Sequence, residues 1–115
     1  MKILLANRNR DFLRSYAELF DRRGDVVTCA FDGAQTVIEL SGGEFDCAVI
    51  DASLPRVDCA RVVRAAELSM TRTVVLYDSP TPSGVPASAR RLAYPFTPNE
   101  LFAAVDSADN PPAVD

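Results

Sequence analysis

Short apolar runs alternate with polar, turn-forming stretches along the chain, and this pattern predicts alternating strands and helices. Consecutive apolar residues predict strands at 2–6, 25–30, 46–51 and 73–77, followed by a brief edge strand at 92–93. Apolar residues spaced three and four apart predict helices at 11–23, 33–40, 57–68 and 98–106. The segment 46–51 is apolar on both faces, which is typical of a central strand in a parallel sheet.

The same periodicity predicts which helical residues face the core. In the first helix the set is Phe12, Leu13, Tyr16, Leu19 and Phe20. The inward residues are expected to be Ala34, Val37 and Ile38 in 33–40, and Val62, Val63 and Ala66 in 57–68.

Residues 78–86 interrupt the alternation, because they hold three prolines and a glycine. Proline removes a backbone donor and clashes with the preceding helical turn, so little helix is expected before about Pro86. At most one helical turn is expected at 87–91. The helix that belongs between the fourth and fifth strands is therefore predicted to be short or lost.

Strands that alternate with helices through short turns predict a parallel sheet covered on both faces. We expect an α/β, flavodoxin-like (βα)5 fold with strand order 2-1-3-4-5, whose ligand crevice lies beyond the carboxyl ends of strands one and three. Residues 1–108 are expected to form one domain, and 109–115 have the composition of a linker or disordered tail.

Composition excludes several classes of function. A net charge of −4 argues against general nucleic-acid binding, which requires a basic face. No apolar stretch approaches the roughly 20 residues that span a bilayer, and no secretory signal precedes the first strand, so a cytoplasmic protein without membrane contact is expected. Cys29, Cys47 and Cys59 lack metal-binding spacing and histidine is absent, so we expect free, buried or half-buried thiols.

Polar residues follow two of the predicted central strands. Asp51 closes the apolar run 47–50, and Asn7 and Arg8 follow the first strand. Because the carboxyl ends of parallel strands meet at one edge of the sheet, these three side chains are expected to share the crevice.

The residues around Asp51 also form a recognisable motif. The segment from Phe45 to Asp58 reads Phe-Asp-x-Ala-Val-Ile-Asp-x-x-Leu-Pro-x-Val-Asp. It is accompanied by Phe-Asp-Gly at 31–33 and by Pro-Phe-x-x-x-Glu-Leu at 95–101. Over roughly residues 2–106 the chain thus resembles the receiver domain of response regulators (CheY-like), and more specifically a degenerate, pseudo-receiver form.

The resemblance implies a set of site residues that this chain has largely replaced. In the family, two acids and the phospho-acceptor aspartate hold Mg²⁺, a Ser or Thr and a Lys contact the phosphoryl group, and an aromatic residue moves with the switch. Asp51 matches the acceptor, here a vestigial one. The other positions fall on Asn7 and Arg8 (acids), Asp78 (hydroxyl, or Ser79 if the alignment shifts by one), Tyr94 (lysine) and Arg91 (aromatic), while Cys59 replaces a glycine.

These replacements change the expected chemistry. A guanidinium stays protonated and cannot bind a metal, and Asn7 offers at most a neutral oxygen. With Arg8 beside Asp51 the local charge is near zero, so no Mg²⁺ is expected. Each lost group would cost about 2–4 kcal/mol of transition-state stabilisation. We therefore expect no enzymatic activity and negligible phosphotransfer. Arg8 either forms a standing ion pair with Asp51 or points into solvent, and the sequence leaves both open.

Three functions follow as alternatives. The first is a docking module for a signalling protein, such as a histidine kinase core or a neighbouring receiver. The second is a cyclic di-GMP-binding module, because some receiver-like proteins with arginines near the fifth strand bind this ligand. Its candidate surface is Arg90, Arg91, an exposed Tyr94, Pro95 and Phe96. The arginines could equally be solvated charges and Phe96 a core residue. The third is a receiver weakly phosphorylated at Asp51.

Overall fold

The computed structural model describes residues 1–78, 80 and 84–107. These residues form five strands and four helices. In chain order the elements are β1 (Lys2–Ala6), α1 (Arg10–Arg22), β2 (Val26–Ala30), α2 (Gly33–Gly42), β3 (Cys47–Asp51), α3 (Cys59–Leu68), β4 (Arg72–Tyr77), β5 (Arg90–Ala93) and α4 (Pro98–Ser107). Polar caps define several helix starts, since Asn9, Asp32 and Asp58 accept backbone N–H bonds at the first turns of α1, α2 and α3.

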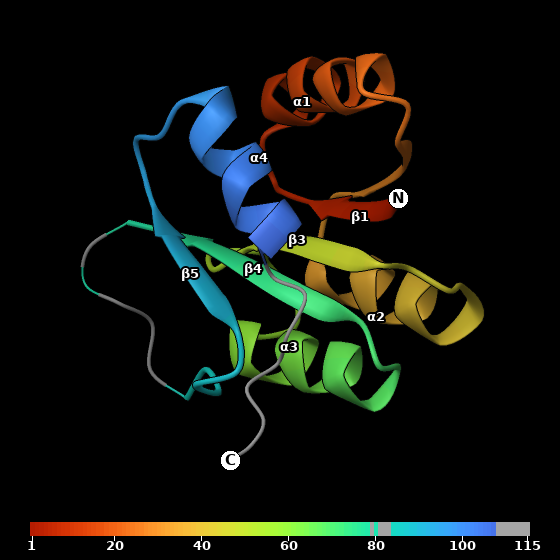
Figure 1. The fold of residues 1–115 in the computed structure, drawn as a ribbon. Coiled ribbons are helices and arrows are strands. Elements are labelled where there is room, and N and C mark those ends of the chain that lie inside the picture. The colour runs from red at the N-terminus through yellow and green to blue at the C-terminus, as the bar shows by residue number, and fades with distance from the viewer. Residues whose placement is uncertain (79, 81–83, 108–115) are drawn as a thin grey trace.

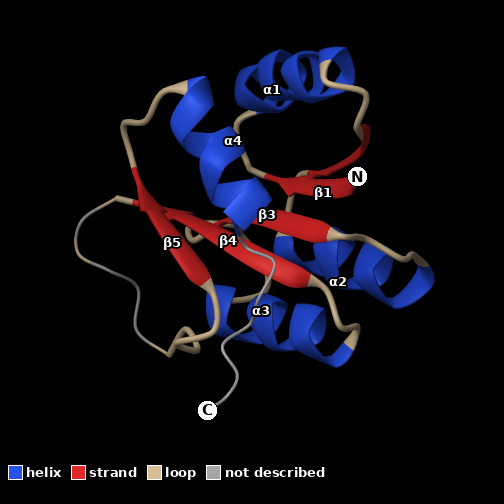
Figure 2. Cartoon of the chain, viewed as in Figure 1, coloured by secondary structure: helices blue, strands red, loops and turns tan. Residues whose placement is uncertain are grey.

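The strands form one parallel sheet in the order β2-β1-β3-β4-β5, which confirms the predicted topology. Helices α1 and α4 cover one face of the sheet, and α2 and α3 cover the other (Figures 1 and 2). All strands run in the same direction, so the carboxyl ends of β1, β3 and β4 meet at one edge. Asn7 and Arg8, Asp51, and Asp78 lie at that edge.

The core has two layers because side chains of each central strand alternate between faces. On β1, Ile3 and Leu5 pack toward α1 and α4, whereas Leu4 and Ala6 pack toward α2 and α3. Every side chain of β3 is buried, as predicted for a strand with helices on both sides. The inward positions predicted for 57–68 are confirmed, since Val62, Val63 and Ala66 are fully buried.

The predicted inner face of the second helix is partly wrong. Ile38 is 69% exposed, whereas Thr36 and Leu40 are buried. These two residues lie four apart and so share a face, which turns position 38 away from the sheet. Burial of Thr36 is tolerated because its hydroxyl donates a 2.7 Å hydrogen bond to the carbonyl of Asp32.

The connection between β4 and β5 contains no helix among its described residues, in line with the prediction of a short or lost helix. Ala87 and Ser88 form a turn, closed by a 3.1 Å bond from the Ala89 N–H to the Pro86 carbonyl. No helical turn forms at 87–91, where the sequence predicted at most one. Arg90 and Arg91 belong to β5, where they pair with Val74 and Val75.

Cys47 and Cys59 are buried and Cys29 is half-buried, and all three are free thiols. Within the described ranges no helix combines the length and apolar character needed to cross a bilayer. Ser79 and the predicted tail at 109–115 lie outside the described residues.

Candidate functional site

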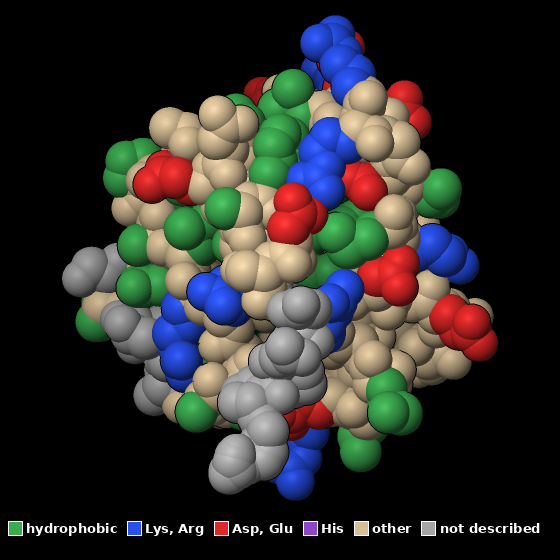
Figure 3. Space-filling view, in the orientation of Figure 1, with side chains coloured by type: hydrophobic (Ala, Val, Ile, Leu, Met, Phe, Trp, Pro, Cys, Tyr) green, Lys and Arg blue, Asp and Glu red, His purple; other side chains and the backbone are tan. Residues whose placement is uncertain are grey.

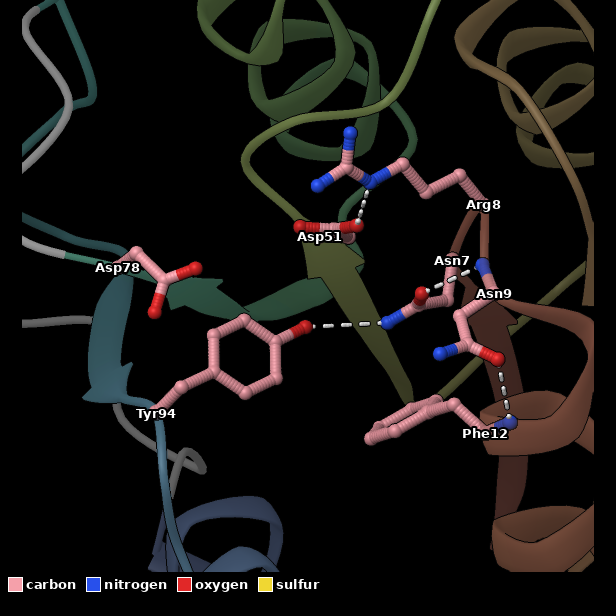
Figure 4. Close-up of a pocket in the computed structure, with 7 residues that line it drawn as sticks. All are labelled: Asn7, Arg8, Asn9, Phe12, Asp51, Asp78 and Tyr94. Atoms are coloured by element: carbon pink, nitrogen blue, oxygen red, sulfur yellow. Dashed lines mark hydrogen bonds and ion pairs between the residues drawn. The ribbon is translucent and has the colours of Figure 1, made fainter.

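A pocket of about 220 Å³ opens at the carboxyl edge of the sheet, beside Asp51 (Figure 4). Five predicted site residues line it, namely Asn7, Arg8, Asp51, Asp78 and Tyr94. Asn9 and Phe12, which the sequence analysis did not assign to the site, complete the lining. The pocket therefore collects side chains from the carboxyl ends of β1, β3, β4 and β5, together with Phe12 of α1.

Asp51 is the most buried charged group in this pocket, with only 4% of its surface exposed. One carboxylate oxygen, Oδ1, accepts a 3.1 Å hydrogen bond from the backbone N–H of Ser53. The other, Oδ2, lies 3.8 Å from Nε of Arg8. Burial raises the pKa of Asp51, and the Ser53 N–H and the Arg8 charge only partly oppose this shift. The fold thus holds a carboxylate with few partners.

Arg8 combines the two arrangements that the sequence left open. Its Nε pairs with Asp51, yet its side chain is 62% exposed. The 3.8 Å separation is longer than a hydrogen bond, and an exposed pair of this kind contributes only about 0–1 kcal/mol. Arg8 therefore places a positive charge beside the carboxylate without locking it rigidly.

Asn7 is fully engaged by its neighbours. It is 2% exposed, and its Oδ1 accepts a 2.9 Å hydrogen bond from the backbone N–H of Asn9. Its Nδ2 donates a 3.1 Å bond to the hydroxyl of Tyr94 (Figure 4). The amide thus turns its donor toward the pocket, while its oxygen faces the backbone N–H of Asn9.

Tyr94 is half-buried, so the exposed tyrosine expected from the sequence is wrong. Its ring stacks on Phe96 at 5.3 Å, and its hydroxyl reaches across the pocket to Asn7. Burial, followed by the nearby charge of Asp51, raises the pKa of Tyr94 to about 12. At neutral pH the position that the resemblance aligns with a lysine therefore carries a neutral phenol.

The remaining residues of the predicted ligand surface do not converge. Arg91 donates a 2.8 Å hydrogen bond from Nη2 to the carbonyl of Val85, on the side of the sheet that α3 covers. Arg90 directs its Nη2 to the carbonyl of Ser107 in α4, 3.4 Å away on the opposite side. Adjacent strand residues point to opposite faces, so the two arginines do not form one clamp.

Phe96 packs against the aromatic rings of α1, consistent with the core role that the sequence also allowed. Pro95 is exposed. Arg91, the predicted switch position, is not among the residues that line the pocket. The cyclic di-GMP alternative stays a prediction.

The atoms in this pocket that could coordinate a metal do not fit a resident Mg²⁺ ion. Mg²⁺ prefers near-octahedral oxygen ligands, usually carboxylates together with water. Here one carboxylate is paired with Arg8 and the amide oxygen of Asn7 is taken. Within 1–78, 80 and 84–107, no cluster of three or more acidic or thiol side chains could hold a metal. Asp78 does change the charge balance, because two carboxylates and one guanidinium leave one negative charge in excess.

No protein-family model matches the chain, and no curated protein matches it. Several solved structures do match the chain. A response regulator receiver protein from Sinorhizobium medicae is 27% identical, with a TM-score of 0.84 over 94% of this chain and 93% of that one. The receiver domain of the Francisella response regulator 1452 is 22% identical, with a TM-score of 0.79 over 94% and 95% of the two chains.

A third match is the N-terminal domain of a response regulator/sensory box/GGDEF protein from Carboxydothermus hydrogenoformans. It is 23% identical, with a TM-score of 0.79 over 94% of this chain and 93% of that one. The sheet order and these likenesses show that the chain has the fold of response-regulator receiver domains of the CheY-like class. The motif around Asp51 agrees with that fold. The Carboxydothermus match is one domain of a three-domain protein.

Proposed function

We propose that this chain is a degenerate receiver that regulates an attached or partner signalling protein by docking, without phosphorylation of Asp51. The observation that carries the proposal is the state of the two positions after β1. Both polar atoms of the Asn7 amide are hydrogen-bonded, and Arg8 sets a guanidinium 3.8 Å from the acceptor carboxylate. Neither residue supplies a metal ligand.

Electrostatics then oppose phosphoryl transfer. A bound cation normally offsets the repulsion between an attacking carboxylate and the phosphoryl oxygens. In this pocket an incoming phosphoryl group would face Asp51 and Asp78, and among the described residues that line it Arg8 alone is cationic. Each missing electrostatic partner costs about 2–4 kcal/mol, so losing the acidic pair and the lysine makes the reaction negligible.

A site whose side chains are held in one arrangement suits docking to a partner protein. Asn9, Asn7 and Tyr94 form a hydrogen-bonded chain that connects the start of α1 to the end of β5. Stacking of Tyr94 on Phe96 extends this connection toward α1 and α4. The domain would then present one constant surface to its partner, such as a histidine kinase core or a neighbouring receiver in the cytoplasm.

The test is phosphorylation by acetyl phosphate with Mg²⁺, followed by intact-mass measurement. The wild-type chain is expected to show no phosphoryl adduct. The triple variant Asn7→Asp, Arg8→Asp, Tyr94→Lys restores the missing partners and is expected to gain an adduct that a further Asp51→Asn change removes. Labelling of the wild type to the extent of the triple variant would show a working phospho-acceptor and refute the proposal.

Calorimetric titration with cyclic di-GMP separates the docking proposal from the ligand-binding alternative. We expect no saturable heat, because Arg90 and Arg91 are engaged on opposite faces of β5. Saturable binding that disappears in Arg91→Ala or Tyr94→Ala would favour the nucleotide-binding module instead.

A further inference from the structure

The pocket beside Asp51 combines two carboxylates with two aromatic rings. Asp51 and Asp78 enter from the ends of β3 and β4, and Phe12 and Tyr94 from α1 and the end of β5. Figure 4 shows the carboxyl groups and the phenol directed toward a common space. Carboxylates next to aromatic faces are the chemistry by which proteins bind organic ammonium groups, through charge-assisted hydrogen bonds and cation–π attraction.

Asp51 has unused binding capacity. It is 4% exposed, and the contact of its Oδ2 with the Arg8 side chain is a long one of 3.8 Å. The backbone N–H groups of Ser53 and Arg8 are the other partners of the carboxylate, and both lower its pKa. A carboxylate oxygen that lines a pocket and holds only a long ion pair can accept a shorter, charge-assisted hydrogen bond from a second cation. Because the contact between Arg8 and Asp51 is long and exposed, it is weak enough for a second cationic group to compete with it.

The charge and the volume of the pocket restrict the class of ligand that it can bind. The excess negative charge disfavours an anion, and the engaged amide of Asn7 disfavours Mg²⁺. A volume of about 220 Å³ is several times the roughly 30 Å³ share of one water molecule, so an alkyl chain fits beside the charge. A compact ammonium with rotatable donors suits two carboxylates from different strands better than the rigid fork of a guanidinium.

We propose that the docking partner inserts a lysine side chain into this pocket, with its ammonium between Asp51 and Asp78 and its alkyl stem against Phe12 and Tyr94. This inference rests on the proposed docking function and names the chemistry by which the partner is recognised.

The experiment is an NMR titration of the ¹⁵N-labelled chain with N-acetyl-lysine-methylamide. The backbone amides of Asp51, Ser53 and Asp78 are expected to shift saturably, with a dissociation constant on the order of 1 mM, as befits one isolated side chain. Asp51→Asn and Asp78→Asn should each weaken binding about tenfold. Arg8→Gln should strengthen it about two- to fivefold, because an exposed competing charge is removed.

Matched controls separate the pocket from general attraction between charges. Asp11→Asn removes an 89% exposed carboxylate on α1 and should leave the affinity unchanged. The ε-acetylated lysine analogue, which lacks the charge, should not bind, and the blocked arginine analogue should bind more weakly than lysine.

Several results would overturn the inference: no saturable shift with the lysine probe, equal binding of the neutral analogue, retained affinity in Asp51→Asn and Asp78→Asn, or saturation by MgCl₂ instead of lysine. Failure here is distinguishable from failure of the docking proposal. Labelling of the wild type by acetyl phosphate refutes that proposal, whereas an unlabelled chain that ignores lysine refutes only the inference about the partner.

Discussion

Asp51 illustrates how one carboxylate behaves when its usual partners are absent. Burial raises its pKa, so the folded state favours the protonated form over the ionised one. The stabilisation from that preference is complete below the unfolded-state pKa and is lost as the pH rises through the folded-state pKa. At neutral pH the ionised side chain therefore lowers the stability of the fold relative to a neutral residue of the same shape.

This predicts that Asp51→Asn stabilises the domain at pH 7. Asparagine keeps the oxygen that accepts from the Ser53 N–H, and it removes the buried charge. The free energy of unfolding should rise by about 1–2 kcal/mol, the scale of a buried polar group that lacks a full set of partners. The gain should shrink as the pH falls toward about 4, near the ordinary pKa of Asp.

Urea denaturation at the two pH values measures the effect, with Asp11→Asn as an exposed control that should change little. An Asp51→Asn variant that is less stable than the wild type at pH 7 would mean that the carboxylate has stabilising partners the account omits.

At the scale of elements, the loop after β3 is held against the start of α2. The Gly33 N–H donates a 2.9 Å bond to the carbonyl of Pro55, and Nε of Arg56 lies 3.2 Å from Asp32. A Cβ on Gly33 would meet the backbone oxygen of Val57 at 2.6 Å. This close approach sets the path of the loop that follows Asp51.

Gly33→Ala is therefore expected to destabilise the domain by about 1–3 kcal/mol, the usual cost of overpacking. Gly42→Ala is the matched control, because a Cβ there has nothing within 4 Å. Since alanine favours helix over glycine by up to about 1 kcal/mol, the control should be neutral or slightly stabilising at the end of α2. Equal losses of stability in the two variants, measured by urea denaturation, would contradict the described packing.

Most elements were predictable from the sequence because continuous apolar runs and helical spacing are strong local signals. Two predictions failed, one for a long-range reason and one for a local reason. Arg90 and Arg91 carry no apolar signal, and they are strand residues because they pair with Val74 and Val75 of β4. Ile38 lies outside because Thr36 and Leu40 occupy the inner face of a short helix whose pattern is ambiguous.

The site was predictable in position but not in its contacts. The rule for parallel strands brings Asn7, Arg8 and Asp51 together, and the structure confirms this. The bond between Asn7 and Tyr94 joins residues 87 positions apart, which no local pattern specifies. Asn9 did carry a signal, since Asn before a helical run is typical of an N-cap. Phe12 was assigned to the core, and its edge reaches the pocket as well.

At the scale of the whole molecule, the receiver fold is retained while its chemistry depends on a few side chains at one edge of the sheet. On the face that Figure 3 shows, acidic and basic side chains are interspersed and do not form one basic field. That mixture agrees with the net charge of −4 and gives no support to nucleic-acid binding. A shared fold does not carry function with it, so the site has to be tested directly.

Binding of Mg²⁺, measured by isothermal titration calorimetry, tests the central claim most directly. The wild-type chain is predicted to show no saturable heat through the millimolar range, because the residues after β1 offer an engaged amide and a guanidinium. The double variant Asn7→Asp, Arg8→Asp should bind Mg²⁺, since it places carboxylates at both positions beside Asp51. Saturable binding by the wild type with the affinity of the double variant would contradict the account.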